Sequence, residues 1–178
     1  VYRGLDNPMT ISFAGIGDNF VNASAPGLVK AGGNGKYNLK PQSGTEVTVS
    51  VSGKMTDGKT VSDKKVFRIK NIPAPAGAIG GGTGVQKGAK SRLEVSQVSA
   101  KLEDFLYDLS FQVTQFTFKV PGQPAIVVSG DRVDGRCKAA LARVTRGDQV
   151  TISDIKTKVV GGANIVVPTA APVIYEIQ

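Results

Sequence analysis

Short runs of alternating apolar and polar residues recur along this chain, and most of them end at Gly, Pro, Asn or Asp. In the clearest run, Val47, Val49 and Val51 lie on one side while polar residues lie on the other. Successive side chains of a β-strand point to opposite faces of the sheet, so this run predicts a strand with one buried face. The Val, Ile and Thr residues of the other runs favour strands as well, and we predict a mainly β protein.

The same pattern predicts further strands along the whole chain. They cover residues 10–13, 36–41, 61–69, 126–128, 150–155, 165–167 and 173–177. Between the run that ends at Val51 and the run over 61–69, Asp57-Gly58 predicts a tight hairpin turn, because Gly readily adopts the positive φ that such a turn needs. Short strands at this spacing are typical of a sandwich of about seven strands.

Two closely spaced prolines, Pro73 and Pro75, interrupt this pattern. Proline cannot donate a hydrogen bond to a sheet and holds the chain extended. We therefore predict a Pro-rich linker over residues 73–76, which joins a first domain over residues 1–72 to a second over residues 77–178. The fold class that we expect is all-β, with two tandem immunoglobulin-like β-sandwich domains and one short helix.

Most aromatic side chains of the second domain lie in one segment, residues 102–120. They are Phe105, Tyr107, Phe111, Phe116 and Phe118. We predict that this segment forms the core of the second domain. The alternation that runs through Phe111 and Val113 changes parity before Phe116, which predicts a bulge or a register shift between strands.

Two other segments of the second domain depart from the strand pattern. The glycine-rich run over residues 80–84 predicts a flexible or specially turned loop. Farther on, Cys137, Leu141 and Val144 recur at helical spacing among alanines, which predicts a short helix near residues 136–145. A single cysteine rules out an intrachain disulfide, and we expect Cys137 to be a half-buried core residue.

Charge and hydropathy limit the classes of function. The net charge of +8 suits an acidic partner surface, a nucleic acid or an anionic envelope polymer, although ordinary solubility explains it better. We expect no nucleic-acid binding, because the aromatic residues cluster where the core is predicted rather than among basic residues. No run reaches the ~18 to 20 apolar residues of a membrane-spanning helix. We expect the chain to be a fragment of a longer protein whose targeting and anchoring segments lie upstream.

Candidate catalytic groups are sparse. The chain contains no histidine, which removes the commonest general base and every Ser-His or Cys-His arrangement. Asp131 and Asp134 could be offered as a carboxylate pair, but each stands beside a glycine, and turn chemistry explains them better. We therefore expect a protein that is not an enzyme, with no catalytic, cofactor or metal site.

One run is similar to a phosphate-binding loop of the form G-x-x-x-x-G-K-S. It begins at Gly84 and ends at Ser91, but Ala89 stands where the motif requires its second glycine. We also expect neither a buried strand before the run nor an amphipathic helix after it, and such a loop uses the start of a helix to hold phosphate. Phosphate binding is therefore not our prediction.

Several segments together resemble the signatures of one family. Tyr2-Arg3-Gly4-Leu5-Asp6-Asn7-Pro8 resembles Y-R-G-x-x-N-P, Phe67-Arg68-Ile69-Lys70-Asn71-Ile72-Pro73-Ala74-Pro75 resembles F-R-V-K-x-I-P-D-P, and Arg146-Gly147-Asp148 resembles a near-terminal Gly-Asp segment. These are signatures of the GldM (PorM) family of gliding motility and type IX secretion. The motif positions, which we expect to be structural, are Tyr2, Arg3, Gly4, Asn7, Pro8, Phe67, Arg68, Pro73, Pro75, Gly147 and Asp148.

The resemblance implies a protein of a Gram-negative bacterium that is anchored in the inner membrane. There an N-terminal helix works with a membrane partner as a proton-driven motor, and the periplasmic arm is a long homodimer of four domains. This chain corresponds to the third and fourth domains. They would reach a ring-forming lipoprotein and an associated periplasmic ring protein below the outer membrane and transmit motion to that ring, without a cofactor.

Two other hypotheses stay open at this point. A glycan- or adhesion-type β-sandwich binding module of a cell-envelope protein would expose aromatic side chains on a sheet face or on loop tips. A small anion-binding or hydrolytic domain would have a polar cleft with converging carboxylates or backbone amides, most plausibly around residues 80–91.

Overall fold

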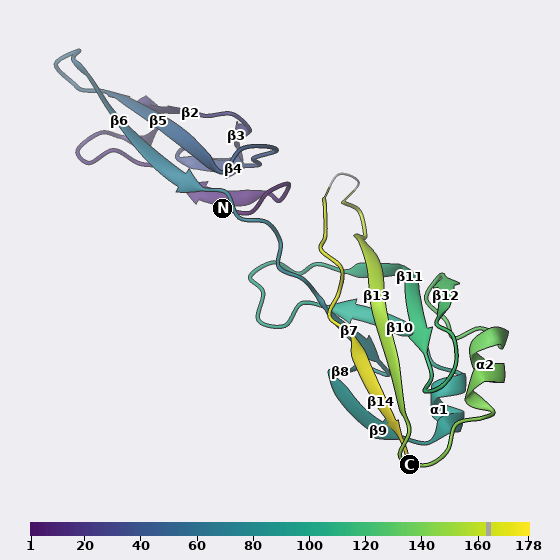
Figure 1. The fold of residues 1–178 in the computed structure, drawn as a ribbon. Coiled ribbons are helices and arrows are strands. Elements are labelled where there is room, and N and C mark those ends of the chain that lie inside the picture. Colours follow the sequence, from purple (N-terminus) through teal and green to yellow (C-terminus); the bar gives the residue numbers. More distant parts are fainter. Residues whose placement is uncertain (163–164) are drawn as a thin grey trace. The chain divides into compact units, whose positions relative to one another are not determined.

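The computed structural model describes residues 1–162 and 165–178. The chain divides into two compact units, Val1–Ile72 and Pro73–Gln178, and each is described by itself. Strands arranged in several sheets make up most of the regular structure of both units, as Figure 1 shows. The predicted all-β class is confirmed. No helix within the described residues has the length and apolar character needed to cross a membrane.

The first unit contains two three-stranded antiparallel sheets. One has the order β1 (Asn7–Thr10), β4 (Lys36–Leu39), β3 (Leu28–Lys30). The other has the order β2 (Val21–Ser24), β5 (Glu46–Lys54), β6 (Thr60–Arg68), and the short 3-10 helix η1 (Asp18–Phe20) precedes β2. Apolar residues from both sheets share one cluster, so the sheets pack face to face as a sandwich.

The hairpin of β5 and β6 follows the alternation of the sequence closely. Val47 and Val49 are buried, and their strand pairs with β6 through nine residue pairs. Gly58 has a φ of +85° in the connecting turn, and the Asp57 carboxylate accepts a hydrogen bond from the Lys59 amide at 2.9 Å. The predicted hairpin is therefore confirmed. The strand predicted over residues 10–13 is displaced, because β1 ends at Thr10.

The core of the first unit is small. Leu39, Val47 and Val49 are its buried centre, and further apolar side chains around them are only partly buried. Those partly buried residues are Val1, Met9, Ile11, Ala23, Ala25, Leu28, Val51, Phe67 and Ile69. A three-on-three sandwich has too few strands to cover all of these side chains, so one side of the core stays accessible.

The second unit is built on a five-stranded sheet. Its order is β12 (Ile126–Ser129), β11 (Phe111–Lys119), β13 (Gln149–Val159), β14 (Val173–Ile177), β9 (Val85–Gly88). A smaller sheet has the order β10 (Val98–Lys101), β7 (Ala76–Ile79), β8 (Gly82–Thr83). The helices α1 (Lys90–Glu94) and α2 (Gly135–Leu141) lie side by side in Figure 1. Only the pairing of β14 with β9 is parallel among the strand pairs of the described residues.

The predicted register shift in the aromatic segment is confirmed. Pairing of β11 with β13 is irregular between Val113 and Gln115 and again between Gln115 and Thr117. After the shift, the Phe116 and Phe118 side chains are both fully buried in the core of the second unit. The bulged strand thus keeps both rings inside although the alternation of the sequence changes before them.

The first part of the aromatic segment is not part of the core, and our prediction was wrong there. Residues 102–110 form an irregular connection between β10 and β11, in which Leu106 is 86% exposed. Asp104 has a φ of +53°, and the acidic residues Glu103, Asp104 and Asp108 stand among the apolar ones. A segment of this kind cannot bury one continuous face, so the sheet begins only at Phe111.

The structure bears on three further expectations for the second unit. The glycine-rich run holds the specially turned form of the two that we expected, because Gly80 and Gly81, with φ of +54° and +82°, turn β7 directly into β8, which begins at Gly82. No strand forms over residues 165–167, where Pro168 follows and cannot donate to a ladder. Ala76, which we assigned to the linker, is the first residue of β7.

The helical content also differs in detail. The helix predicted near residues 136–145 is α2, but it ends at Leu141, and the β-branched Val144 and Thr145 that follow are poor helix formers. A second short helix, α1, was not predicted. Cys137 on α2 is fully buried rather than half-buried.

Candidate functional site

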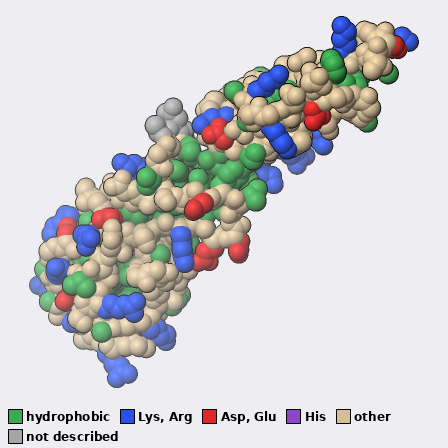
Figure 2. Space-filling view, turned by 180° about the vertical axis from the view of Figure 1, so that it is seen from behind, with side chains coloured by type: hydrophobic (Ala, Val, Ile, Leu, Met, Phe, Trp, Pro, Cys, Tyr) green, Lys and Arg blue, Asp and Glu red, His purple; other side chains and the backbone are tan. Residues whose placement is uncertain are grey.

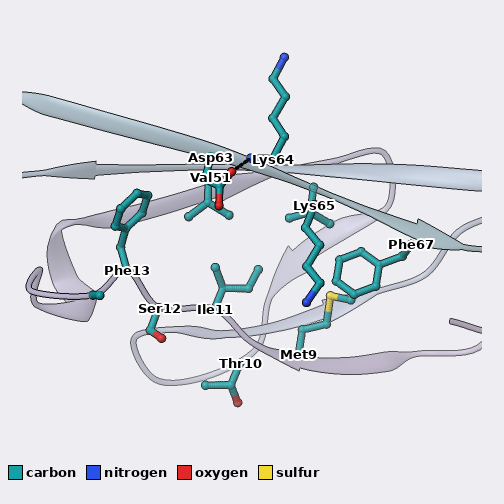
Figure 3. Close-up of a pocket in the computed structure, with 12 residues that line it drawn as sticks. Met9, Thr10, Ile11, Ser12, Phe13, Val51, Asp63, Lys64, Lys65 and Phe67 are labelled. Atoms are coloured by element: carbon teal, nitrogen blue, oxygen red, sulfur yellow. Dashed lines mark hydrogen bonds between the residues drawn. The ribbon is translucent and has the colours of Figure 1, made fainter.

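A groove opens on the accessible side of the first unit (Figure 3). It has a volume of about 590 Å³ and lies between β6 and residues 9–14, which comprise the end of β1 and the loop after it. Val49 and Val51 on β5 line it from within. The groove exists because the core residues Met9, Ile11, Val51 and Phe67 are only partly covered by the two small sheets.

Charged side chains of β6 lie along this apolar groove. Lys65 points into it in Figure 3, with its ammonium nitrogen 5.6 Å from the centre of the Phe67 ring, while Lys64 points away. The Asp63 carboxylate accepts a hydrogen bond from the backbone amide of Lys64 at 2.7 Å. An ammonium close to an aromatic face is stabilised by the ring, and it stays available to an incoming carboxylate.

The backbone of β6 presents a strand edge beside the groove. Ile69 donates to the Thr45 carbonyl, and Met55 donates to the Lys59 carbonyl, so in this register the odd-numbered residues of β6 bond to β5. The even-numbered residues therefore direct their amides and carbonyls away from the sheet. Within the described residues, β6 is the last strand of its sheet.

The outer edge of β6 already carries a short strand pairing at its far end. The Val1 amino group donates to the carbonyl of Arg68, and the Lys70 amide donates to the carbonyl of Val1. Tyr2 and Lys70 form a parallel bridge. Part of this edge is therefore already paired with the start of the chain.

The motif residues at the start of the chain make hydrogen bonds within the first unit. The Arg3 guanidinium donates to the side-chain oxygen of Asn71 at 2.9 Å and to the carbonyls of Gln42 and Gly44 at 3.2 and 2.8 Å. Gly4, at a φ of +73°, lets its amide donate to the Pro41 carbonyl. The planar, five-donor guanidinium suits such a fan of carbonyl acceptors.

Asn7 is the buried polar residue beside these positions. Its side-chain nitrogen lies 2.9 Å from the carbonyl oxygens of Tyr2, Leu5 and Leu39, and its side-chain oxygen accepts from the Tyr2 amide at 2.8 Å. Pro8 follows it in β1. The side chain thus replaces backbone partners that a tight turn at the chain's start lacks.

The remaining motif positions lie in three places. Phe67 and Arg68 end β6, so the Phe67 ring lines the groove, while the Arg68 carbonyl accepts from Val1. Pro73 and Pro75 begin the second unit, where the Pro75 carbonyl accepts from the Ala171 amide. Gly147, at a φ of +90°, precedes Asp148, whose carboxylate accepts from the amide and hydroxyl of Thr145.

The structure thus brings the first two signatures together and leaves the third apart. Arg3 meets Asn71 of the second signature, and Tyr2 bridges to Lys70. Gly147-Asp148 belongs to the other unit. The groove, by contrast, was not predicted. Its signals in the sequence are the two charged residues Asp63 and Lys65, which stand at inward-facing positions of an otherwise alternating strand.

The run that resembles a phosphate-binding loop is part of the sheet. Residues Val85–Gly88 are strand β9, paired with β14, and the Gly84 and Gly88 carbonyls accept from Ile174 and Gln178. We expected no helix after the run, but α1 begins at Lys90 and has five residues. A paired strand does not offer the ring of free amides that cradles a phosphate.

A second, shallower cavity of about 380 Å³ lies beside this run. Gly80, Gly81 and Arg92 line it together with Val95, Ser96, Gln97 and Ser99. None of these described lining residues is a carboxylate, so the cavity lacks the converging acidic groups that a hydrolytic domain would use.

The groups whose pKa values are shifted, Cys137 and Asp134, lie on α2 and at its N-terminal cap. Burial raises the pKa of the Cys137 thiol to about 11, which keeps it protonated and unreactive near neutral pH. Burial acts to raise the pKa of the neighbouring Asp134 carboxyl, but hydrogen bonds from the Cys137 amide and from Arg136 together lower it. No group of three or more metal-ligating side chains occurs within residues 1–162 and 165–178.

On the face drawn in Figure 2, basic side chains are spread out rather than gathered in one patch. Figure 2 shows Lys and Arg side chains distributed over both units on the face drawn, with fewer acidic ones among them. A surface of this kind attracts acidic partners weakly everywhere, so local geometry has to supply specificity.

Comparisons with known proteins show what the chain is similar to. No curated protein sequence matches the chain. A solved structure of zebrafish RET cadherin-like domains 1 to 4 aligns with 99% of this chain at 8% sequence identity and a TM-score of 0.23. The chain spans 45% of that structure's length.

Two family models match in succession. The first, the GldM third domain, matches residues 1–70, and the second, the GldM C-terminal domain, matches residues 73–178. Their common boundary coincides with the division between the two compact units. The chain therefore belongs to the GldM family of gliding motility and type IX secretion and comprises the family's third domain followed by its C-terminal domain.

Proposed function

We propose that this chain is the outer part of a periplasmic arm that transmits motion from an inner-membrane motor to a lipoprotein ring at the outer membrane. The observation that carries this proposal is the direct succession of the family's third and C-terminal domains, at residues 1–70 and 73–178. A role in gliding and secretion that uses two β modules without catalytic groups is mechanical rather than chemical.

The internal structure of each unit suits such a role. β5 and β6 are joined through nine residue pairs, and the large sheet of the second unit holds the terminal strand β14 between β13 and β9. A load applied along paired strands is shared by many hydrogen bonds at once. The core of the second unit contains the fully buried rings of Phe116, Phe118 and Tyr175. A close-packed core of this kind transmits strain through the unit.

The partners that we propose follow from the family. The arm works as a homodimer in the periplasm and contacts the ring-forming lipoprotein and its associated periplasmic ring protein. It is driven by the motor partner of an N-terminal membrane helix that belongs to the longer protein. The chain binds no nucleic acid and needs no cofactor in this role.

The glycan-binding alternative would need exposed aromatic side chains on a sheet face or on loop tips, and the aromatic pair in the connection between β10 and β11 does not provide them. Phe105 and Tyr107 are half-buried, and their ring centres lie 5.7 Å apart with the ring planes tilted by 45°. A platform that stacks sugar rings or other flat groups presents open aromatic faces. We therefore propose no second function.

Light scattering tests the proposal directly. The solution mass of this chain is measured alone and then mixed with the purified ring lipoprotein, with an unrelated outer-membrane lipoprotein as the control. We expect twice the chain mass alone and a larger complex with the ring lipoprotein only. A monomer whose mass does not change in either mixture would overturn the arm hypothesis.

A further inference from the structure

The cavity beside the turn between β7 and β8 is not explained by the proposed mechanical role. We propose that it binds the C-terminal carboxylate of a peptide chain together with an apolar side chain of the last residue. The proposal goes beyond the arm function and does not depend on it.

Arg92 supplies the positive charge of this site. Its guanidinium lies directly against the turn, because a Cβ atom placed on Gly80 would be 2.9 Å from the Nη2 atom of Arg92. Within the described residues, the guanidinium forms neither an ion pair nor a hydrogen bond. A guanidinium can hold a carboxylate through two parallel hydrogen bonds, and all of its donors are available here.

The turn supplies backbone donors beside this guanidinium. Gly80 and Gly81 line the cavity, and both have the positive φ of a tight two-residue turn. Neither of their amides donates a hydrogen bond to another group of residues 1–162 and 165–178. Capture of a terminal carboxylate by backbone amides is a recurring mode of peptide recognition. The two amides and the guanidinium together offer such a group several donors.

The charges next to the cavity favour a singly charged ligand. Arg92 is the only charged residue among the described residues that line it. Asp131 stands outside the lining, and its carboxylate accepts from the side-chain nitrogen of Gln97 at 2.6 Å. Arg132, which forms a backbone bridge with Gln97, offsets the charge of Asp131. A carboxylate therefore matches the remaining positive charge better than a doubly charged phosphate.

The acidic residue of α1 lies on another side of the helix. Lys90 and Glu94 are four residues apart, so they share one side of α1. The Lys90 ammonium donates to the carbonyl of Val144 at 3.0 Å, which turns this side toward the segment after α2. Arg92 is two positions from each of them and therefore projects from the other side, toward the turn. Glu94 thus does not compete with a ligand for Arg92.

Val95 supplies an apolar contact for the last side chain of the peptide. It follows α1, lines the cavity and is 74% exposed. The cavity has a volume of about 380 Å³, within the range of about 300 to 1,000 Å³ that is typical of small-ligand sites. An apolar side chain could cover Val95 while the adjoining carboxylate meets Arg92.

The test is an NMR titration of the complete, isotope-labelled chain with acetyl-Gly-Leu, which ends in a free carboxylate. We expect the amide signals of Gly80 and Gly81 to move, with a Kd of about 1 mM. Acetyl-Gly-Leu amide, which has no charge, should bind at least about tenfold more weakly. Acetyl-Gly-Gly, which keeps the carboxylate but has no apolar side chain, should bind about threefold more weakly.

Substitutions test the role of the guanidinium. Arg92→Gln should weaken the binding of acetyl-Gly-Leu about tenfold, and Arg92→Lys should weaken it less, because lysine keeps the charge but not the paired hydrogen bonds. The control is Arg146→Gln, the same change at an exposed residue outside the lining, which should alter the affinity by less than about twofold. Thermal unfolding shows whether each variant is folded.

Several results would overturn the proposal. They are unmoved signals of Gly80 and Gly81, equal binding of the free and amidated peptides, equal binding of acetyl-Gly-Gly, and equal losses with Arg92→Gln and Arg146→Gln. Inorganic phosphate or acetyl-Glu amide that binds as tightly as acetyl-Gly-Leu would also overturn it, since the site would then not select a chain terminus. The lipoprotein mixture described above reports separately on the arm function.

Discussion

The side-chain amide of Asn7 donates to the carbonyl oxygen of Leu39 at 2.9 Å, across 32 positions of the chain. Leu39 is fully buried and belongs to β4, the central strand of its sheet. The same amide nitrogen also lies 2.9 Å from the carbonyls of Tyr2 and Leu5. One buried side chain therefore fixes the first turn of the chain onto the sandwich.

Replacing Asn7 should destabilise the first unit. In Asn7→Ala, the buried carbonyls and the Tyr2 amide lose their partner, and each unsatisfied buried group costs about 1 to 3 kcal/mol. Native-state hydrogen exchange should show faster opening of β1 and β4 with unchanged protection in β13. The control is Asn22→Ala, on the exposed face of β2, which should have little effect. Equal effects of the two changes would contradict the role that we assign to Asn7.

Gly77 on β7 should not tolerate a side chain. A Cβ atom at this position would lie 2.5 Å from the backbone oxygen of Ala171 and would also meet the Ile155 side chain. Relief requires a backbone shift, and such overpacking costs about 1 to 3 kcal/mol. Gly77→Ala should therefore lower the denaturation midpoint of the second unit.

The matched control for that change is Gly135→Ala. Gly135 is the first residue of α2, and a Cβ atom there would have no neighbour within 4 Å. Alanine favours the helix by up to about 1 kcal/mol over glycine, so this variant should be neutral or more stable. Destabilisation by both variants would show that the close approach at Ala171 is not the cause.

The Asp134 cap should stabilise α2 in a pH-dependent way. Its carboxylate accepts from the amides of Arg136 and Cys137 at 3.0 Å, and its pKa is below the ordinary value of 3.8. Such a group contributes stability above that ordinary value and loses it as the pH falls through the lower folded-state pKa. Asp134→Ala should cost about 0.5 to 2 kcal/mol near neutral pH, and the cost should shrink below about pH 4.

Urea unfolding at several pH values measures this difference. Asp134→Asn serves as the control, because the amide oxygen still caps the helix but carries no charge. Its cost should be smaller than that of Asp134→Ala at neutral pH and should shrink in parallel as the pH falls, because the titrating carboxylate belongs to the unsubstituted chain. A cost for Asp134→Ala that stays constant as the pH falls would contradict the charged cap.

The Cys137 thiol should be inert in the folded protein. Burial raises its pKa from 9.0 to about 11, so about a hundredfold less thiolate is present near neutral pH than for an ordinary thiol. An aromatic disulfide reagent should therefore modify it only after urea is added. Rapid labelling of the native chain would contradict the burial of α2 against the core.

The same thiol predicts a loss of stability at alkaline pH. A pKa that is higher in the folded state means that the contribution is present below about pH 9 and is lost as the pH rises toward 11. Cys137→Ala should remove this part of the pH dependence. The measurement is the difference in unfolding free energy between the two proteins from pH 8 to pH 11, and parallel curves would contradict it.

Patterns in the sequence predicted the elements whose formation depends mainly on residues close together in the chain. The alternation of Val47, Val49 and Val51 and the turn at Gly58 define the β5 and β6 hairpin, since both depend on neighbouring residues. The segment around Phe105 misled us, because aromatic composition indicated a core although its interleaved acidic residues cannot share one face. Nothing near Arg3 in the sequence indicated that its guanidinium would meet the carbonyls of Gln42 and Gly44.

The amino-acid sequence by itself determined the β class, the main hairpin, the register shift before Phe116 and the family signatures. Only the tertiary structure decided that β9 adds in parallel to β14, that Tyr175 is buried in the core, and that β6, the last strand of its sheet in the described residues, lies beside a groove. The physical reason is the range of the interactions. Side-chain alternation encodes which face of a strand avoids water, whereas the choice of neighbouring strands depends on contacts between residues far apart in the chain.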